Sequence, residues 1–333
     1  MHTKAMTFSR HILEEAKVQQ DMTAELSSLL MQMGYVGKIL SREIARAPLK
    51  GRLGLVGETN PTGDAQKKLD VYTNDIMVEA FSETGPVAGL VSEELEELKI
   101  LSLGREAKYI LCTDPLDGSS NTDINAPIGT IFGIYRCSGN NHRELEQNLL
   151  NERMKQIAAG YVLYGASTML VYTCGHGVYG FTLDCDLGEF LLVHENISCP
   201  ARGHYCSANL GRYHEWSSDI QNFIAHLTVH DPSTRRPYSL RYTGALVADF
   251  HRSLLEGGVY FYPPDADHKN GKLRFLYECA PLAFVVEQAG GCASTGTQRL
   301  LDLKVELLHQ RAPFVIGSTE EVALYEKFLT GGT

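Results

Sequence analysis

Two aspartates three residues apart, directly after an apolar segment, constrain the fold more than any other feature of the sequence. Residues 108–113 (Lys-Tyr-Ile-Leu-Cys-Thr) are typical of a short buried strand, and Asp114-Pro-Leu-Asp117-Gly-Ser-Ser follows at once. Open α/β sheets place their ligands beyond the carboxyl ends of the strands. We therefore expect an α/β (α+β) fold in which both carboxylates lie just past the end of a strand.

The residues of this motif suit a metal ion and a phosphate together. Asp114 and Asp117 supply the oxygen ligands that hard divalent cations prefer. Gly118, Ser119 and Ser120 can offer backbone N–H groups and hydroxyls to a phosphate, as a tight turn or a helix start does. A single loop carboxylate is usually a surface charge, but the preceding strand and the following turn argue against that reading. The motif predicts phosphoryl transfer, in which charge on the reacting oxygens must be neutralised.

Further acidic residues can join this pair. Glu93 and Glu94 follow the predicted strand 87–91. Asp64 follows the predicted loop 49–63, and Asp70 and Glu278 lie near the starts of the predicted helices 67–81 and 275–288. Magnesium or manganese ions held by such carboxylates would lower the pKa of a water molecule, and a neighbouring carboxylate would accept its proton. The sequence therefore predicts a metal-assisted hydrolase.

The rest of the chain alternates between helical and strand patterns. Apolar spacing predicts helices at 11–19, 23–47, 67–81, 217–226, 245–256, 275–288 and 320–329. Strands are predicted at 87–91, 130–136, 157–164, 168–173, 177–182, 190–193, 259–262 and 314–316. Residues 49–63 are rich in Gly, Pro, Asn and Thr and predict a loop. This order indicates helices combined with two sheets.

Charge and composition exclude several classes of function. The formal net charge is −10, and no basic stripe interleaved with aromatic residues is present, so we expect no nucleic-acid partner. No apolar run approaches the ~20 residues of a membrane helix, and the first residues lack the apolar centre of a signal peptide. We expect a cytoplasmic protein without a membrane partner. None of the eight cysteines forms a C-x-x-C pair, which favours reduced, structural thiols.

The stretch 114–123, together with Gly-Thr-Ile-Phe-Gly-Ile-Tyr-Arg at 129–136, closely resembles the class I fructose-1,6-bisphosphatases. The Asp-Pro-Leu-Asp-Gly-Ser piece alone marks the wider lithium-sensitive, metal-dependent phosphatase superfamily. The resemblance covers roughly residues 6–329. It implies a layered α-β-α-β-α sandwich of the sugar phosphatase type, with a regulatory and metal-binding domain at 1–196 and a substrate-binding domain at 197–333.

The resemblance also implies roles for the acidic residues. The direct metal ligands would be Glu93, Asp114, the carbonyl of Leu116, Asp117 and Glu278, holding two to three Mg²⁺ or Mn²⁺ ions per subunit. Asp70 and Glu94 would be the pair that takes the proton from the attacking water. Asp64 would complete a metal–water shell when its loop closes.

The second half of the chain supplies the implied substrate residues. The phosphate turn 118–120 would be joined by a sugar pocket of Asn209, Tyr242, Tyr262, Lys272 and Arg274, with Lys272 and the tyrosine hydroxyls on the distal phosphate. Arg241 would reach into a neighbouring subunit of a homotetramer. Arg212 stands where animal enzymes have a tyrosine that contacts this phosphate, so either Arg212 or Tyr213 could serve there.

A regulatory AMP site is also implied. Its matching residues are Thr23, Glu25 and Ser27 at a helix start, with Lys108, Tyr109 and Arg136 on strands. A helix N-terminus and two cations suit a phosphate. The alternative is an ordinary helix cap beside two surface cations, and Ala24 replaces a glycine that is common in the family motif.

The resulting hypothesis is a fructose-1,6-bisphosphate 1-phosphatase that releases fructose 6-phosphate in gluconeogenesis or a carbon-fixation cycle. The alternative is dual activity on sedoheptulose 1,7-bisphosphate, because the same clamp could hold a sugar one carbon longer. Inositol monophosphatases share the residues 114–119, but the run 272–278 and the chain length argue against that activity. The intact acidic set disfavours a metabolite sensor without turnover.

Overall fold

The computed structural model describes residues 5–61, 63, 65–82, 85–103, 107–139, 141–150 and 155–331. The helices are α1 (Phe8–Val18), α2 (Ala24–Arg46), α3 (Lys68–Ser82), α4 (His142–Leu149), α5 (Ser218–Thr228), α6 (Leu246–Glu256), α7 (Ala280–Gln288) and α8 (Thr319–Leu329). Short helical turns are η1 (Pro48–Lys50), η2 (Ser119–Ile124), η3 (Leu210–Glu215), η4 (Pro232–Thr234), η5 (Phe275–Cys279) and η6 (Leu300–Asp302). No helix in these ranges has the length and apolar character needed to span a membrane.

The larger sheet has eight strands in the order β10-β9-β8-β7-β6-β5-β3-β4. Its strands are β3 (Val87–Ser92), β4 (Lys99–Ile100), β5 (Tyr109–Asp117), β6 (Ile128–Arg136), β7 (Lys155–Tyr164), β8 (Thr168–Thr173), β9 (Tyr179–Asp184) and β10 (Glu189–His194). Among the strands described for this sheet, β3 and β5 are the one pair that runs parallel, so the carboxyl ends of these two strands lie side by side.

The smaller sheet has five strands in the order β12-β11-β13-β17-β15. Its strands are β11 (Tyr205–Ser207), β12 (Ser239–Leu240), β13 (Val259–Tyr262), β15 (Cys292–Ser294) and β17 (Phe314–Gly317). Two separate ribbons pair β1 (Leu55–Thr59) with β2 (Ala65–Lys67), and β14 (Leu273–Arg274) with β16 (Arg311–Ala312).

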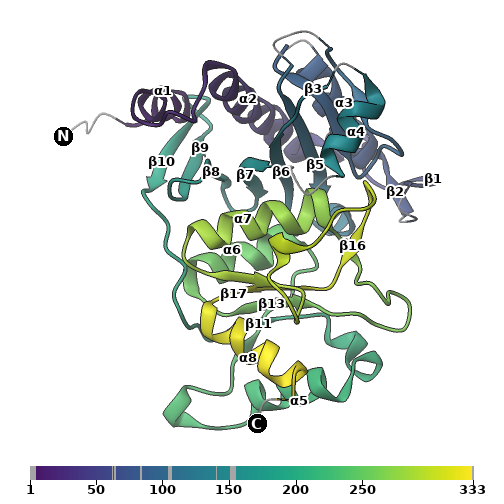
Figure 1. Cartoon of the computed structure of the whole chain (residues 1–333), viewed down its shortest axis with the longest axis vertical. Coiled ribbons are helices and arrows are strands. Elements are labelled where there is room, and N and C mark those ends of the chain that lie inside the picture. The colour runs from purple at the N-terminus through teal and green to yellow at the C-terminus, as the bar shows by residue number, and fades with distance from the viewer. Residues whose placement is uncertain are drawn as a thin grey trace.

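Alternating side chains on the central strands bury both faces of both sheets. On β5, Tyr109 and Leu111 pack with α1–α3, whereas Ile110 and Cys112 pack with α6 and α7. The β13 residue Phe261 packs on the other side of the second sheet, against α5 and α8. The order of layers is therefore helices, sheet, helices, sheet, helices (Figure 1). This confirms the predicted α-β-α-β-α sandwich.

The structure corrects two local predictions around the site. Strand β5 continues through Asp117, so the aspartates lie within its last four residues and not beyond its end. The register with β6 shifts between Asp114 and Asp117, which interrupts the regular alternation there. The predicted helix 275–288 begins with a π-helical turn, Phe275–Cys279, before α7.

Candidate active site

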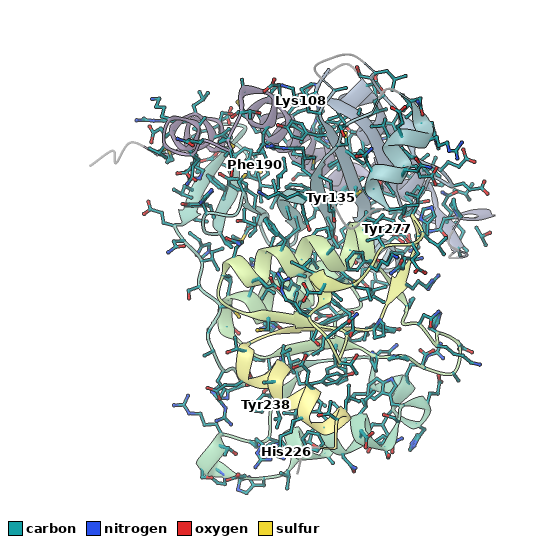
Figure 2. The ribbon with its side chains drawn as sticks, in the orientation of Figure 1. Lys108, Tyr135, Phe190, His226, Tyr238 and Tyr277 are labelled. Carbon is teal, nitrogen blue, oxygen red and sulfur yellow. The ribbon has the colours of Figure 1, made fainter. Side chains whose placement is uncertain are left out.

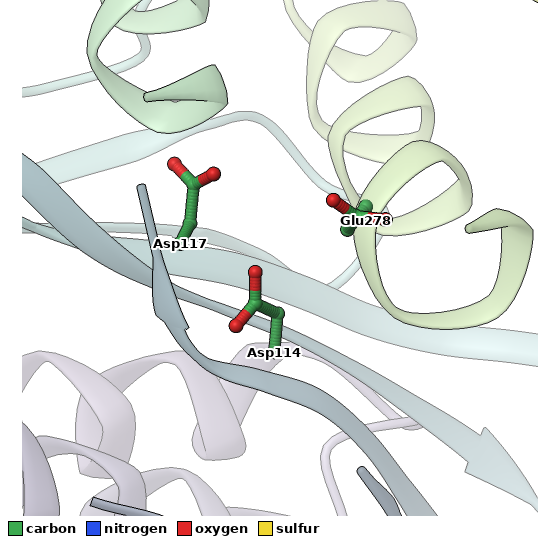
Figure 3. Close-up of side chains that lie close together, drawn as sticks. All are labelled: Asp114, Asp117 and Glu278. Atoms are coloured by element: carbon green, nitrogen blue, oxygen red, sulfur yellow. The ribbon is translucent and has the colours of Figure 1, made fainter. Parts of the chain in front are cut away.

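Three buried carboxylates from two elements converge at the junction between the first sheet and the α6/α7 layer. One oxygen each of Asp114, Asp117 and Glu278 lies within 4.8 Å of the others. Figure 3 shows the two aspartates on one strand and Glu278 on the neighbouring helical turn. This spacing suits a shared divalent cation, because oxygen ligands around one ion lie at such distances.

Backbone N–H groups hold each of these carboxylates in place. Both Asp117 oxygens accept from the first residues of α6, Leu246 N at 3.1 Å and Val247 N at 2.7 Å. Asp114 Oδ1 accepts from the N–H of Leu116 at 2.9 Å, and Glu278 Oε2 accepts from that of Arg274. The carboxylates are therefore oriented by neutral donors, and their negative charge is left for another group to balance.

The charge balance of the cluster favours a bound cation. Burial, together with the neighbouring carboxylates, raises the pKa of Asp117 to about 7 and that of Glu278 to about 8. Burial and the Glu93 carboxylate raise the pKa of Asp114 well above its usual range. The guanidinium of Arg274 lies 3.0 Å from Glu93 and 3.9 Å from Glu278. One arginine cannot neutralise four carboxylates, so the donor set fits divalent metal ions.

The cluster opens into a cavity of about 350 Å³. The other predicted acidic residues, Asp70, Glu93 and Glu94, line the same cavity. Burial raises the pKa of Asp70 to about 6 and that of Glu94 to about 7. Asp70 Oδ2 accepts from the N–H of Lys67 at 2.8 Å. Asp64, the remaining acidic candidate, lies outside the described residues.

The small turn after Asp117 borders this cavity. Gly118, Ser119 and Ser120 line it together with Leu116. Gly118 has a φ of +76°, and a Cβ atom there would lie 2.4 Å from the Cβ of Ala245. Only glycine therefore allows α6 to approach closely enough to bind Asp117.

The carboxylates that line the cavity form what we call the acidic wall: Asp70, Glu93, Glu94, Asp114, Asp117 and Glu278. Sequence reasoning missed three residues beside it. Lys67 is buried, and its Nζ donates to Asp123 at 2.8 Å and to Thr122 at 3.2 Å. Gln66 Nε2 donates to Glu94, and Asn60 Nδ2 lies 3.4 Å from Glu93 Oε1. Asn60 lies in the predicted loop 49–63, which the structure shows to contain strand β1, and Gln66 and Lys67 lie in β2, the strand paired with β1. This short ribbon carried no strand signal in the sequence.

The predicted substrate residues divide into two groups. Tyr242, Tyr262, Lys272 and Arg274 line the cavity, and Lys272 Nζ lies 5.9 Å from the centre of the Tyr262 ring. Asn209 is not among the residues that line it and instead caps η3 by accepting from Gly211 N.

Two predicted arginines lie outside this cavity: Arg241, which was expected to reach a neighbouring subunit, and Arg212. Arg241 is exposed, and its guanidinium donates to the carbonyl of Leu240. Arg212 is ion-paired with Glu215 at 2.8 Å and Asp267 at 2.6 Å. Neither Arg212 nor Tyr213 lines the cavity within this subunit.

The six residues predicted for AMP lie around the start of α2. Thr23 caps the helix by accepting from Leu26 N at 3.2 Å, and its hydroxyl lies 2.9 Å from that of Tyr109. Lys108 is paired with Glu25, and Ser27 is buried. Arg136 lines an adjacent cavity of about 250 Å³, which the other five residues do not line.

Comparisons with known proteins all point to the same family. Family models described as the N-terminal and C-terminal domains of fructose-1-6-bisphosphatase match residues 6–195 and 199–330. A class 1 fructose-1,6-bisphosphatase of Acaryochloris marina is 57% identical over 98% of both chains. One of Chlorobium phaeobacteroides (strain BS1) is 48% identical over 98% of this chain and 99% of its own.

A solved structure gives the same result for the fold. The chain superposes on the crystal structure of Leishmania major fructose-1,6-bisphosphatase in its holo form with a TM-score of 0.91 and 39% sequence identity. The match covers 98% of this chain and 99% of that one.

Proposed function

The chain belongs to the class 1 fructose-1,6-bisphosphatases, metal-dependent phosphoric monoester hydrolases of carbohydrate metabolism, and we propose that it removes the C1 phosphate of fructose 1,6-bisphosphate. The observation that carries this proposal is the convergence of Asp114, Asp117 and Glu278 within 4.8 Å at the wall of one cavity. The products would be fructose 6-phosphate and inorganic phosphate.

The acidic wall would hold two to three Mg²⁺ or Mn²⁺ ions. Its ligands would be Asp114, Asp117, Glu278, Glu93 and the carbonyl of Leu116, with Asp64 completing the shell when its loop closes. Bound ions of this kind lower the pKa of water, screen the phosphate and stabilise the leaving alkoxide. The raised pKa values of the three buried carboxylates support this assignment, because a cation would relieve their repulsion.

Asp70 and Glu94 would accept the proton of the attacking water. Both line the cavity, and both have pKa values raised toward neutrality by burial. A general base works best when its pKa lies near the working pH. The N–H of Lys67 and the amide of Gln66 orient the two carboxylates.

Other residues that line the same cavity would bind the sugar and its unreactive phosphate. Backbone groups and hydroxyls of the turn 118–120 would hold the reacting phosphate, and Arg274 would contact the sugar. Lys272 with the hydroxyls of Tyr242 and Tyr262 would hold the distal phosphate, because a dianion that does not react is best clamped by cations and hydroxyls. The exposed Arg241 would complete a neighbouring subunit's site in a homotetramer. In this proposal the metal site would lie mainly in the domain 1–196, and the residues for the sugar and the distal phosphate would lie in the domain 197–333.

We also propose that AMP binds at the start of α2. The supporting geometry is the helix N-terminus at Thr23, with Lys108 nearby and Arg136 on the adjacent cavity. Lys108 would exchange its present partner Glu25 for the phosphate. Inhibition by AMP should be lost in Lys108→Ala and Arg136→Ala, and inhibition that is unchanged in both would contradict this site.

Release of inorganic phosphate from a panel of substrates tests the catalytic proposal. The panel contains fructose 1,6-bisphosphate, sedoheptulose 1,7-bisphosphate, fructose 1-phosphate, fructose 6-phosphate and inositol 1-phosphate, each with Mg²⁺ and with EDTA. We expect metal-dependent release from fructose 1,6-bisphosphate and retention of the C6 phosphate. Equal turnover of the seven-carbon substrate would establish dual activity, and preference for inositol 1-phosphate would contradict the proposal.

A further inference from the structure

The metal ligands of this site come from elements that belong to different parts of the fold. Glu93 follows β3 of the first sheet, whereas Glu278 lies in the π-helical turn η5. Their carboxylates repel one another, and the guanidinium of Arg274, 3.0 Å from Glu93 and 3.9 Å from Glu278, offsets part of that repulsion. Other contacts between the two elements then help to set their separation. The contacts that join the turn after β3 to η5 therefore affect how well the site binds metal.

One histidine makes such a connection. The Nδ1 atom of His309 lies 2.8 Å from the hydroxyl of Tyr277, the neighbour of Glu278 in η5. Its Nε2 atom lies 3.1 Å from the carbonyl oxygen of Glu96, three residues after Glu93. A carbonyl can only accept, so Nε2 carries the proton, and in the neutral ring Nδ1 accepts from Tyr277.

The segment that carries His309 is itself fixed to η5. The N–H of Phe275, the first residue of η5, donates to the carbonyl of Gln310 at 2.7 Å. The next two residues form β16, which pairs with β14 immediately before η5. His309 therefore extends from a segment that is hydrogen-bonded to η5, and it contacts the carbonyl of Glu96 in the turn after β3.

A second contact holds the other side of η5 to the first sheet. The buried hydroxyl of Tyr135 on β6 donates to the carbonyl of Leu276 at 3.2 Å. Figure 2 shows Tyr135 and Tyr277 at the boundary between the first sheet and the layer of α6 and α7. Strand β6 is thus joined to η5 through Tyr135, and the turn after β3 is joined to it through the Tyr277–His309–Glu96 chain.

We propose that His309 is a positioning residue for the metal site, which holds the turn of Glu93 and Glu94 at the correct distance from Glu278. The proposal rests on the metal-dependent function proposed above. His309 is not among the residues that line the cavity. It acts through Tyr277 and the Glu96 carbonyl, as outer residues do when they orient metal ligands.

The chain offers a matched control for the loss of a tyrosine–histidine contact. Tyr161 and His251 form the same type of hydrogen bond, 2.7 Å between the hydroxyl and Nδ1, and neither residue lines the metal cavity. The variants are His309→Ala and Tyr277→Phe, with His251→Ala and Tyr161→Phe as controls. Tyr277→Phe preserves the ring and its packing, so it remains informative if His309→Ala folds poorly.

Metal binding itself is the primary measurement. Mn²⁺ titration followed by electron paramagnetic resonance should show affinity weakened about tenfold in His309→Ala, the lower end of outer-shell effects, and weakened in Tyr277→Phe. The Mg²⁺ concentration for half-maximal activity should rise in parallel, while kcat at saturating Mg²⁺ stays within about twofold of wild type. Both controls should bind Mn²⁺ as the wild type does.

Two outcomes would overturn the inference. One is unchanged Mn²⁺ affinity in folded His309→Ala and Tyr277→Phe, and the other is equal weakening in the two controls. Failure of the proposed function is distinguishable from both. In that case the wild type would bind Mn²⁺ and the His309 variants would bind it less tightly, but no sugar bisphosphate would be hydrolysed.

Discussion

Asp117 combines structural and chemical constraints in a single side chain. Its two oxygens accept the N–H groups of Leu246 and Val247, and it lies within the three-carboxylate cluster. The N–H groups partly offset the cost of burying its charge, yet its pKa remains raised to about 7. A group held in this way favours metal binding over stability of the metal-free protein.

Replacing Asp117 by alanine should therefore abolish turnover without unfolding the protein. We expect kcat to fall by at least about 10³-fold, the equivalent of several kcal/mol of lost metal-dependent stabilisation. The lost N–H bonds are offset by the relief of carboxylate repulsion, so the circular dichroism spectrum should be retained. Wild-type rates in a folded variant would contradict the ligand assignment.

Arg241 allows a second test at the level of single residues. Its guanidinium lies 6.0 Å from the Tyr205 ring, and that of the nearby Arg252 lies 5.2 Å from the same ring. Arg241→Ala should raise the KM for fructose 1,6-bisphosphate by about tenfold, the loss of one charge-assisted contact. Because the distal phosphate contributes mainly uniform binding, kcat should change little.

Arg252→Ala serves as the control for this test. It removes a similar cation from the same aromatic ring and should leave KM unchanged. A decrease in kcat with constant KM in Arg241→Ala would exclude a role in holding the distal phosphate.

At the level of elements, two irregularities build the site. The shift in register between β5 and β6 separates Asp114 from Asp117, and the π-helical turn η5 carries Glu278. Such turns occur often at functional sites. The register shift lies next to the close approach of α6, which Gly118 permits.

Gly118→Ala should therefore damage both the fold and the site. Gly188 is the matched control, because it also has a positive φ, +67° compared with +76°, but has open space around its Cβ position. Gly188→Ala should lose about 1–2 kcal/mol of unfolding free energy from backbone strain alone. Gly118→Ala should lose at least about 2 kcal/mol more through the clash with Ala245, and its Mg²⁺ affinity should fall. Equal losses of unfolding free energy in the two variants, measured by denaturant titration, would show that residue 118 does not limit how closely α6 approaches.

The regular elements and most of the acidic wall were predictable, because they depend on local patterns. The long amphipathic segment 23–47 forms α2 (Ala24–Arg46). The strand predicted at 108–113 begins within one residue of the observed start of β5 at Tyr109. The end of β5, the π-helical turn and the roles of Lys67 and Gln66 depend on contacts between distant segments. Contacts between distant segments leave no periodic pattern in the sequence. These features follow from tertiary packing and could not be predicted from local patterns. The roles of the individual site residues remain predictions.

At the level of the whole molecule, five layers bring a strongly acidic site into a buried junction. The cluster includes Asp117 and Glu278, with pKa values of about 7 and about 8. In the unfolded chain such groups ionise near pH 4. Between these values the folded, metal-free protein binds more protons than the unfolded chain, so these groups make the free energy of unfolding fall as the pH rises.

Metal should consequently stabilise the protein more at pH 8 than at pH 5. Thermal unfolding with EDTA and with Mn²⁺ at both pH values measures this effect, because the metal replaces the protons that the cluster otherwise retains. In Asp117→Ala the pH dependence of the Mn²⁺-induced rise in Tm should shrink. A larger rise at pH 5 than at pH 8 would contradict the expected sign.

The central claim is that carboxylates from β5 and η5 share bound cations beside the scissile phosphate. A crystal soaked with Mn²⁺, fructose 6-phosphate and inorganic phosphate tests it most directly through the anomalous scattering of manganese. We expect anomalous peaks in contact with Asp114, Asp117 and Glu278, and the phosphate between those peaks and the turn 118–120. Manganese bound elsewhere, with these three side chains uncoordinated and the phosphate away from them, would contradict the account.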